Sequence, residues 1–353
     1  MGFSIAVLVV LVQAVRGFIN RRKLASPTPR ASRNALRDAS VTFLVAAWNA
    51  EDDIIPFIES FHSLPIEQKQ LVLCAGGTDK TLELAQRCVS DDVSVIAQHR
   101  GEGKQGALAK AFDSATGEII FLTDIDCRLT ADSVYPLLAY LTQHPDEVAT
   151  GRVRPLGVQC SNNFVLMQWA IREQGMPASG TVVGGLDGRN TAMFRSMLQE
   201  TQALQVPAPS GTDYTLAKEL IRHGFTIRFI GVSRMETEFP PDLSVYVKKQ
   251  ARWLRNVLVL GRRYGAKQDV RATVRTLAFP WVSAVLIASG IYDLNLLGIG
   301  VALIIYSITN RVLYLRNIGA AQAAWSSFTV LLGDWSAAIL TVRHLYRRNF
   351  GWS

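Results

Sequence analysis

The chain has 353 residues, 49% of them hydrophobic, and a formal net charge of +8 at pH 7. This length allows one large buried domain with segments left over. The mean hydropathy of +0.16 indicates that those segments are apolar enough to enter a membrane, which argues against a chain that is soluble throughout. We therefore expect an integral membrane protein with a water-facing domain.

The excess positive charge lies beside apolar segments. Beyond the N-terminal region it is carried by Lys248, Lys249, Arg252, Arg255, Arg262, Arg263, Arg271 and Arg275. A basic collar next to apolar helices is typical of contact with anionic lipid headgroups, so we expect a membrane partner and no nucleic acid. The four cysteines have neither metal-ligand spacing nor a nearby histidine and are expected to be reduced packing residues.

Residues 1–18 are apolar and lack the basic start and the small-residue cleavage site of a secretory signal, which predicts an uncleaved membrane anchor. A basic linker follows at 19–40. The positive-inside rule places this linker and the next domain in the cytoplasm and the N-terminus outside, as in a multi-pass protein of the cell membrane. A disordered basic tail over 24–38 is compatible with this interpretation.

From residue 41 to about residue 130, strand patterns alternate with helix patterns. Strands are predicted at 41–49, 71–77, 93–99 and 118–126, and helices at 50–64, 80–89 and 106–115. This alternation predicts an α/β domain with a mostly parallel sheet and flanking helices. Such sheets bind ligands beyond the carboxyl ends of their strands.

Gly101, Gly103 and Gly106 have the G-x-G-x-x-G spacing of a dinucleotide-binding turn. That turn belongs after the first strand of its domain, whereas these glycines follow the third. Where a ribose-binding acid would stand, the chain has a pair of acids, Asp124 and Asp126. The pair favours phosphate and metal chemistry over hydride transfer.

Asp124 and Asp126 stand at the end of the predicted strand 118–126. Their side chains would point to opposite faces of a straight strand, but a turn lets both converge on one cation. We expect a turn, because Thr130 or Asp132 can cap the helix that follows. Two carboxylates that bind together with substrate phosphates suit Mg²⁺ or Mn²⁺ better than Zn²⁺. Two acids that merely cap a turn are the alternative.

Residues 266–353 form the expected C-terminal membrane region, with apolar segments at 276–292, 294–315 and 325–342. The basic end of the chain favours the cytoplasm, which four crossings from an outside N-terminus would not allow. We therefore expect one segment not to cross. The candidate is 325–342, because it contains Asp334, which is costly in a bilayer unless it is paired or near water.

Six motifs in chain order resemble those of the inverting family 2 glycosyltransferases, whose nucleotide-sugar-binding domain has the GT-A fold. They are AAWNAED, GGTDKT, GEGKQGALAKAF, TDIDC, SGTDYTLAKELIRHGFTIRFI and TEFPPDLSVYVKKQARW. The resemblance covers roughly residues 41–255 and implies a cytoplasmic GT-A domain over 41–265. It also assigns Gly103 and Lys104 to a sugar-nucleotide site instead of a nicotinamide fold.

The resemblance implies a role for each matching residue. Asp213 is expected to be the catalytic base, and Asp124 and Asp126 are expected to bind the metal. Expected donor contacts are Ala46, Asn49, Glu51, Gly76, Asp79, Lys104, Asp124 and Arg252. Trp253 is expected on the acceptor side, together with a tight loop at Gly184 and Gly185.

Two of these residues have an alternative reading. Asp213 precedes a helical pattern and could be its N-cap. Trp253 could anchor the chain at the membrane interface.

The chain departs from the family pattern at three places. Cys74 and Ala75 stand where the family usually has an acidic pair, so the usual carboxylate contact to the nucleotide base is absent. Thr212 replaces the Glu before the catalytic Asp, and Lys249 replaces the first Gln of the last motif. These departures concern the donor rather than the reaction, and a UDP-sugar remains the expected donor.

We expect an enzyme that moves a hexose from a nucleotide-sugar to a lipid acceptor at the cytoplasmic leaflet, with inversion. The order of anchor, catalytic domain and apolar C-terminal segments resembles that of ceramide glucosyltransferase-like lipid glycosyltransferases. A processive polysaccharide synthase is one alternative, although its channel usually needs more spanning helices. A catalytically inactive membrane scaffold is another, although the retained Asp124, Asp126, Asp213, Arg252 and Trp253 argue against it.

Overall fold

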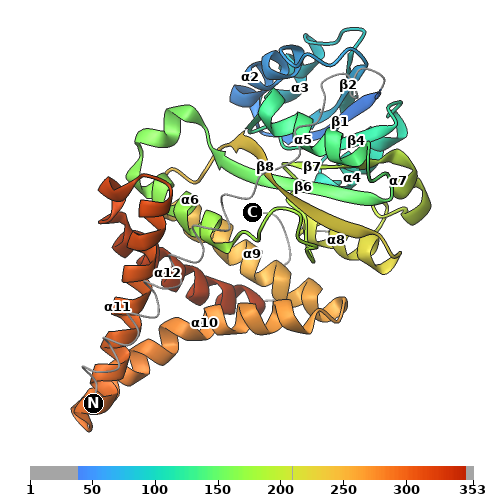
Figure 1. The fold of residues 1–353 in the computed structure, drawn as a ribbon. Helices are drawn as coiled ribbons and strands as arrows, with labels where there is room; N and C mark the ends of the chain where they lie inside the picture. The colour runs from blue at the N-terminus through green and yellow to red at the C-terminus, as the bar shows by residue number, and fades with distance from the viewer. Residues whose placement is uncertain (1–38, 209, 347–353) are drawn as a thin grey trace. The chain divides into compact units, whose positions relative to one another are not determined.

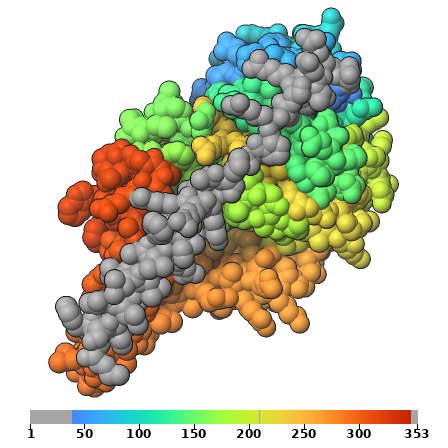
Figure 2. Space-filling view, viewed as in Figure 1, coloured from blue at the N-terminus to red at the C-terminus, as the bar shows by residue number. Residues whose placement is uncertain are grey.

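The computed structural model describes residues 39–208 and 210–346, which are coloured in Figure 2. The predicted anchor, the basic linker up to residue 38 and the basic end of the chain at 347–353 lie outside the described residues. The chain divides into two compact units. The sheet unit contains the described residues up to Leu156 and Pro177–Glu238, and the helical unit contains Gly157–Met176 and the chain from Phe239 onward.

The sheet unit contains one eight-stranded sheet with the strand order β3-β2-β1-β4-β7-β6-β8-β5 (Figure 1). Strands β1 to β4 pair in parallel, whereas β7 is antiparallel to both β4 and β6. The strands are β1 Val41–Trp48, β2 Lys69–Gly76, β3 Val93–Ala97, β4 Ile119–Leu122, β5 Cys127–Arg128, β6 Glu147–Pro155, β7 Thr191–Phe194 and β8 Thr226–Thr237. The predicted parallel arrangement of the first four strands is confirmed.

Helices follow the strands of the sheet unit in the predicted alternation. They are α2 Glu51–His62, α3 Thr81–Gln86, α4 Gly103–Asp113, α5 Ala131–Leu141, α7 Arg195–Thr201 and α8 Thr212–Arg222. The crossovers through α2, α3 and α4 bring the carboxyl ends of β1 to β4 to one edge of the sheet, because parallel strands end on the same side.

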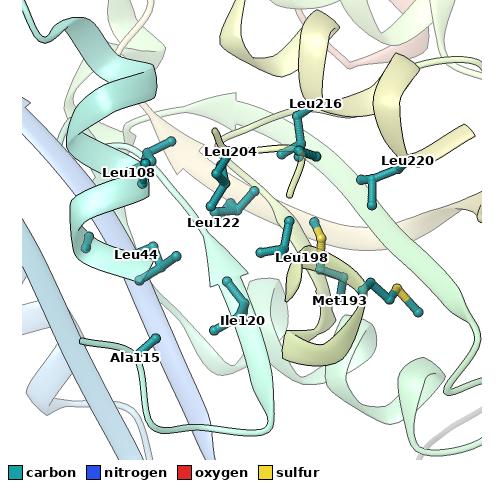
Figure 3. Packing of buried hydrophobic residues seen from close by; sticks show 14 of the residues in the cluster. Leu44, Leu108, Ala115, Ile120, Leu122, Met193, Leu198, Leu204, Leu216 and Leu220 are labelled. Atoms are coloured by element: carbon teal, nitrogen blue, oxygen red, sulfur yellow. The ribbon is translucent and has the colours of Figure 1, made fainter. Parts of the chain in front are cut away.

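Successive side chains of β1 point to opposite faces of the sheet, and other side chains pack against both faces, so β1 is buried on both. On one face, the Phe43 ring lies 5.5 Å from Phe61 of α2 and 5.1 Å from Phe121 of β4, measured between centroids. On the other face, Leu44 belongs to an apolar cluster with side chains of α4, α7 and α8, which Figure 3 shows. Each fully buried leucine of this kind stabilises the fold by roughly 1.5–3 kcal/mol, so the cluster holds the helices that carry the site.

β4 ends at Leu122, earlier than predicted, because the chain turns directly after it. The backbone N–H of Cys127 donates to the carbonyl oxygen of Asp124 at 3.1 Å. Thr130 then caps α5, with its hydroxyl oxygen accepting from the backbone N–H of Ser133 at 3.2 Å. The predicted turn and the predicted cap are both confirmed.

The helical unit consists of η2 Gly157–Ser161, α6 Asn163–Gly175, α9 Leu243–Arg263, α10 Lys267–Ala288, η3 Ser289–Ile291, α11 Leu294–Asn317, η4 Ala321–Ala323 and α12 Ser326–Tyr346. Its helices begin at side-chain caps where the sequence provides Asn or Asp. Asn162 caps α6, Asp242 caps α9 and Asp293 caps α11. An apolar cluster joins side chains of α6, α9, α11 and α12.

Two helical segments among the described residues are long and apolar enough to cross a membrane, Lys267–Ile291 and Leu294–Asn317. They correspond to the first two of the three predicted apolar segments. The third, α12, does not meet the same criterion of length and composition. α12 contains Asp334 near its middle and Arg343 in its last turn, and an acid at the centre of an apolar helix needs a partner.

Asp334 is paired within the helical unit. It accepts a hydrogen bond from the Tyr246 hydroxyl at 2.6 Å and forms an ion pair with the Arg311 guanidinium. Arg311 also contacts Ser307 one turn earlier on α11. Gly333 allows this approach, because a Cβ there would lie 2.8 Å from Cδ1 of the Tyr246 ring. The pair thus ties α12 to α9 and α11.

Replacing Arg311 should destabilise the protein, because the Asp334 carboxylate would lose its cation. The side chains of Arg311 and Asp334 are 14% and 29% exposed. We expect Arg311→Leu to cost about 3 kcal/mol, the lower end for breaking a buried ion pair. Arg316→Leu, at an exposed arginine on the same helix, should stay within about 0.5 kcal/mol of the original. Thermal unfolding in detergent would measure both, and equal losses would show that the ion pair contributes no stability.

Candidate active site

The loops after β1 and β2 hold each other through reciprocal hydrogen bonds. The backbone N–H of Glu51 donates to Asp79 Oδ2 at 3.2 Å, and the backbone N–H of Lys80 donates to Glu51 Oε2 at 2.9 Å. Partial burial acts to raise the pKa of Asp79, but hydrogen bonds from Thr81 and Glu51 outweigh it and lower the pKa. The carboxylates of Glu51 and Asp79, both expected to contact the donor, therefore tie these loops together.

Small residues allow the loops to approach closely. Gly77 has a φ of +137°, and a Cβ at that position would lie 2.8 Å from the backbone nitrogen of Asn49. A Cβ at Gly76 would overlap the carbonyl oxygen of Gln98, at the end of β3. Ala46 lies earlier in β1 and is partly exposed. Gly76, one of the predicted donor contacts, is therefore also required for close packing of β2 against the end of β3.

Lys104 connects two of the predicted site residues that lie far apart in the sequence. Its Nζ lies 2.7 Å from Asp124 Oδ1 and 3.4 Å from Asp213 Oδ1. Asp124 follows β4, Lys104 is the second residue of α4 and Asp213 is the second residue of α8. The side chains of Lys104, Asp124 and Asp213 are 20%, 29% and 42% exposed, so all three can still reach a ligand.

The Lys104 ammonium is held in its charged form. Burial alone would lower the pKa of Lys104, but the Asp124 and Asp213 carboxylates outweigh the effect of burial and raise the pKa above its usual range. One cation therefore neutralises two carboxylates from different elements of the sheet unit.

Asp126 lies in the turn after Asp124, directly before the short strand β5. Its Oδ1 accepts from the Thr237 hydroxyl at 3.2 Å and lies 3.7 Å from the Cys127 sulfur. Burial, reinforced by the Asp126 and Asp124 carboxylates, raises the pKa of the Cys127 thiol well above its usual value. Cys127 is therefore a protonated packing residue and no thiolate ligand for a soft metal.

The donor set around this turn suits a hard divalent cation. Among residues 39–208 and 210–346, no group of three or more His, Cys, Asp or Glu side chains could hold a metal ion. A cage made of protein ligands alone is thus not present there. Two carboxylates on one turn match the way Mg²⁺ is bound, by one or two carboxylates together with substrate phosphates. Asp124 and Asp126 would hold such a cation.

Asp213 does not cap α8, which corrects the alternative reading of this residue. The helix begins at Thr212, the N-cap is Gly211 in a left-handed conformation, and no side chain makes a capping hydrogen bond. The Asp213 carboxylate instead lies beside Lys104. Its place in the first turn of the helix stabilises the negative charge.

Gly188 lies directly against the Asp213 carboxyl group, and sequence reasoning missed it. A Cβ at Gly188 would lie 2.6 Å from the carboxyl carbon of Asp213. The neighbouring residues Asp187 and Arg189 form a largely buried bidentate ion pair with N–O distances of 2.9 and 3.1 Å. The backbone N–H of Asp187 also donates to the Thr150 hydroxyl at 3.0 Å. The loop before β7 is therefore built to place Gly188 beneath Asp213.

Gly184 and Gly185 lie earlier in the same loop and are exposed. The Gly184 carbonyl oxygen accepts a hydrogen bond from the Lys218 ammonium of α8 at 2.7 Å. No heavy atom lies within 4 Å of a Cβ built on Gly185. In this loop, the glycine that must lack a side chain to leave room for Asp213 is Gly188, and not Gly184 or Gly185.

Arg252 and Trp253 lie in the helical unit, on α9. The Trp253 ring is 37% exposed and has two cationic groups over it, Arg172 of α6 at 5.8 Å and Lys249 of α9 at 6.0 Å from the ring centroid. Sequence reasoning did not single out Arg172, which lies far from Trp253 in the sequence. Lys249 was noted for its charge and as a departure from the family pattern, and its spacing from Trp253 by one helical turn also pointed to contact.

The sequence of residues 42–202 matches the family model described as "Glycosyl transferase family 2". This part of the chain is thus similar to family 2 glycosyltransferases, and the protein is a glycosyltransferase. No curated protein sequence matches it significantly.

The first of three similar solved structures supports the fold. The mannosyltransferase PcManGT from Pyrobaculum calidifontis, in complex with GDP-Man and Mn²⁺, is 17% identical with a TM-score of 0.61, covering 97% of this chain and 99% of its own. GalNAc-T7 with UDP, GalNAc and Mn²⁺ is 12% identical with a TM-score of 0.47, covering 69% and 54% of the two chains. TarS from S. aureus is 13% identical with a TM-score of 0.42, covering 62% and 40%. The predicted fold class, a GT-A α/β domain with apolar C-terminal helices, is confirmed.

Gly188→Ala should impair activity far more than stability. The added methyl group would displace the Asp213 carboxyl group, which is the mobile end of a side chain and can move at little cost in folding free energy. If the placement of Asp213 matters for reaction, we expect the transfer rate to fall by about 10² or more. Gly185→Ala is the matched control in the same loop and should remain close to wild type. Equal activity of the two variants would contradict a role for the Gly188 contact.

Proposed function

We propose that this protein transfers a hexose from a nucleotide-sugar to a lipid acceptor at the cytoplasmic leaflet, with inversion and with Mg²⁺ or Mn²⁺. The observation that carries the proposal is the convergence of Asp124, Asp213 and Lys104, with Asp126 on the adjoining turn. Two carboxylates for a cation, one for a base and a mobile ammonium are the groups that this reaction needs.

On the donor side, the leaving nucleoside diphosphate gains negative charge as the bond to the anomeric carbon breaks. A divalent cation held by Asp124 and Asp126 would stabilise that charge. Lys104 can reach the same region from α4, because its ammonium already contacts Asp124. Cys74 and Ala75 of β2 are completely buried. Recognition of the base must therefore use other groups, and a UDP-hexose is the first donor to test, followed by a GDP-hexose.

On the acceptor side, Asp213 would take the proton of the attacking hydroxyl. Its carboxylate is 42% exposed, is fixed from below by Gly188 and has one oxygen beside Lys104. An attack on the face opposite the diphosphate inverts the anomeric carbon. General-base assistance of this kind contributes about 10²–10⁴ in rate.

The fold resemblance to PcManGT supports the donor chemistry, since that protein is described in complex with GDP-Man and Mn²⁺. The membrane part of the proposal is supported by the two apolar helices and their surroundings. Exposed cations at the junction of α9 and α10 precede exposed apolar side chains on α10, namely Trp281, Val282 and Val285. These cations are Arg262, Arg263, Lys267, Arg271 and Arg275. Cations beside an apolar, tryptophan-bearing helix suit the headgroup region of an anionic membrane.

The acceptor would meet Trp253, whose indole ring is flanked by Arg172 and Lys249. Arg252, the preceding residue, is proposed as a further donor contact. The membrane anchor at 1–18, the domain at 41–265, the membrane region from residue 266 and a cytoplasmic active site all belong to this proposal.

Incubation of membranes with labelled nucleotide-sugars, followed by thin-layer chromatography of the lipids, tests the proposal. A single labelled glycolipid is expected. Labelled material that stays at the origin would favour a processive polysaccharide synthase, and no incorporation from any nucleotide-sugar would favour an inactive scaffold. Either of these results would contradict transfer to a lipid.

Asp213→Asn should reduce transfer by about 10² or more, because an amide of the same size cannot accept a proton at neutral pH. Nucleotide-sugar binding and thermal stability should change little. Asp132→Asn is a matched control, since Asp132 and Asp213 are both the second residue of an 11-residue helix. The control removes the same charge from the first helical turn. Transfer by the Asp213 variant within a few-fold of the control would exclude Asp213 as the base.

Chelation with EDTA should abolish transfer, and added Mn²⁺ or Mg²⁺ should restore it. Asp126→Ala should be inactive but folded, since its carboxylate lies in an irregular turn. Asp91→Ala, which removes an exposed acid of the same unit, should keep full activity. Radiolabel transfer and thermal unfolding measure the two properties. Full activity of the enzyme in excess chelator would remove the metal from the proposal.

A further inference from the structure

The Lys104 ammonium contacts a carboxylate oxygen of Asp124, the residue assigned above to the divalent cation. It lies 2.7 Å from Asp124 Oδ1, a charge-assisted hydrogen bond of normal length. A bound Mg²⁺ would bring two further positive charges to the same carboxylate, at about 2.0–2.1 Å from its oxygen. An ammonium and a metal ion bound to the same carboxylate repel each other strongly in a partly buried site. Lys104 and the metal therefore compete for Asp124.

The start of α4 is held in place, so the competition depends on the side chain of Lys104 alone. Gln105, the next residue, donates from Nε2 to the carbonyl oxygens of Ala203 and Leu204 at 3.0 and 3.1 Å. Gln98 donates from Nε2 to the carbonyl oxygen of Gly103 at 3.2 Å. The lysine side chain has four rotatable bonds and can swing while the backbone stays fixed.

The same ammonium also restrains Asp213. At 3.4 Å from Asp213 Oδ1, it neutralises the carboxylate that the proposed function assigns as the base. A nucleoside diphosphate would offer Lys104 an alternative anion. If the Lys104 ammonium moved to the diphosphate, Asp124 would be free to bind the metal and Asp213 would be free to contact the acceptor.

We propose that Lys104 is an internal counter-cation that keeps the divalent metal from binding Asp124 alone and is released only when the donor diphosphate arrives with the metal. This inference rests on the proposed function and adds its regulation. It makes metal binding and diphosphate binding mutually dependent, and such coupling is reciprocal. It also keeps the base neutralised while no donor is bound, which disfavours side reactions.

Mn²⁺ binding to the full-length protein in detergent, measured by electron paramagnetic resonance of free Mn²⁺ with and without UDP or GDP, tests this inference. Wild type should bind Mn²⁺ weakly alone and about tenfold or more tightly with the diphosphate. Lys104→Gln should bind Mn²⁺ alone about tenfold more tightly than wild type and gain much less from the diphosphate.

Two further variants control the experiment. Lys110→Gln removes a lysine of α4 that pairs with Glu102, the residue before the helix, and it should behave like wild type. Lys104→Arg keeps a cation and should bind Mn²⁺ alone no more tightly than wild type, which tests the idea even if the Gln variant does not fold.

The outcomes separate the inference from the proposed function. If Lys104→Gln binds Mn²⁺ alone no more tightly than wild type, or Lys104→Arg binds it more tightly, the competition does not exist, although Mn²⁺ binding with diphosphate would still support the proposed function. If wild type binds no Mn²⁺ even with UDP or GDP, the metal-dependent function fails and the inference fails with it.

Discussion

The parallel pairing of β1 with both β2 and β4 is the constraint on which the site depends. Val41–Leu44 pair with Ile119–Leu122, while the whole of β1 pairs with β2. This register brings the loops that follow the three strands to one edge of the sheet, where Asn49, Asp79 and Asp124 lie. The apolar cluster in Figure 3 then packs α4 and α8 against the same sheet, so that Lys104 and Asp213 reach the edge from one side. Burial of the strands on both faces thus determines where the charged groups meet.

Much of the sheet unit could be predicted because its signals are local. The alternating apolar runs predicted β1 to β4, and the acid pair followed by Thr130 predicted the turn and the cap of α5. The predicted end of the fourth strand, at residue 126, was wrong, because β4 ends at Leu122. An apolar pattern alone does not show where a turn ends a strand. The N-cap alternative for Asp213 was wrong because the N-cap is Gly211, two positions earlier and in a left-handed conformation, so that Asp213 already lies inside the helix.

The contacts that organise the site were beyond sequence reasoning because they join distant segments. No local sequence pattern indicates that Lys104 bridges Asp124 and Asp213. Asp213 lies 109 positions after Lys104 in the chain. The reciprocal bonds of Glu51 and Asp79 and the contact of Gly188 with Asp213 depend on loop geometry of the same kind. The resemblance to a family singled out Asp124 and Asp213, and the packing of α4, α8 and the loop before β7 shows how their side chains come together around Lys104.

In the helical unit, polar residues are accommodated by pairing. Asp334 looked costly for a membrane segment, and its bonds to Tyr246 and Arg311 remove that cost inside the unit. Trp253 is likewise surrounded by cationic groups of two helices. In both arrangements, charged side chains of different helices meet within the helical unit.

We propose that the carboxylates around Lys104 form a nucleotide-sugar transfer centre. A structure of the protein with Mn²⁺ and UDP, with the metal located by its anomalous scattering, would test this proposal. We expect Mn²⁺ at Asp124 and Asp126, and the Lys104 ammonium away from Asp213 and in contact with the diphosphate. Mn²⁺ and UDP bound elsewhere, with Lys104 still between Asp124 and Asp213, would contradict it.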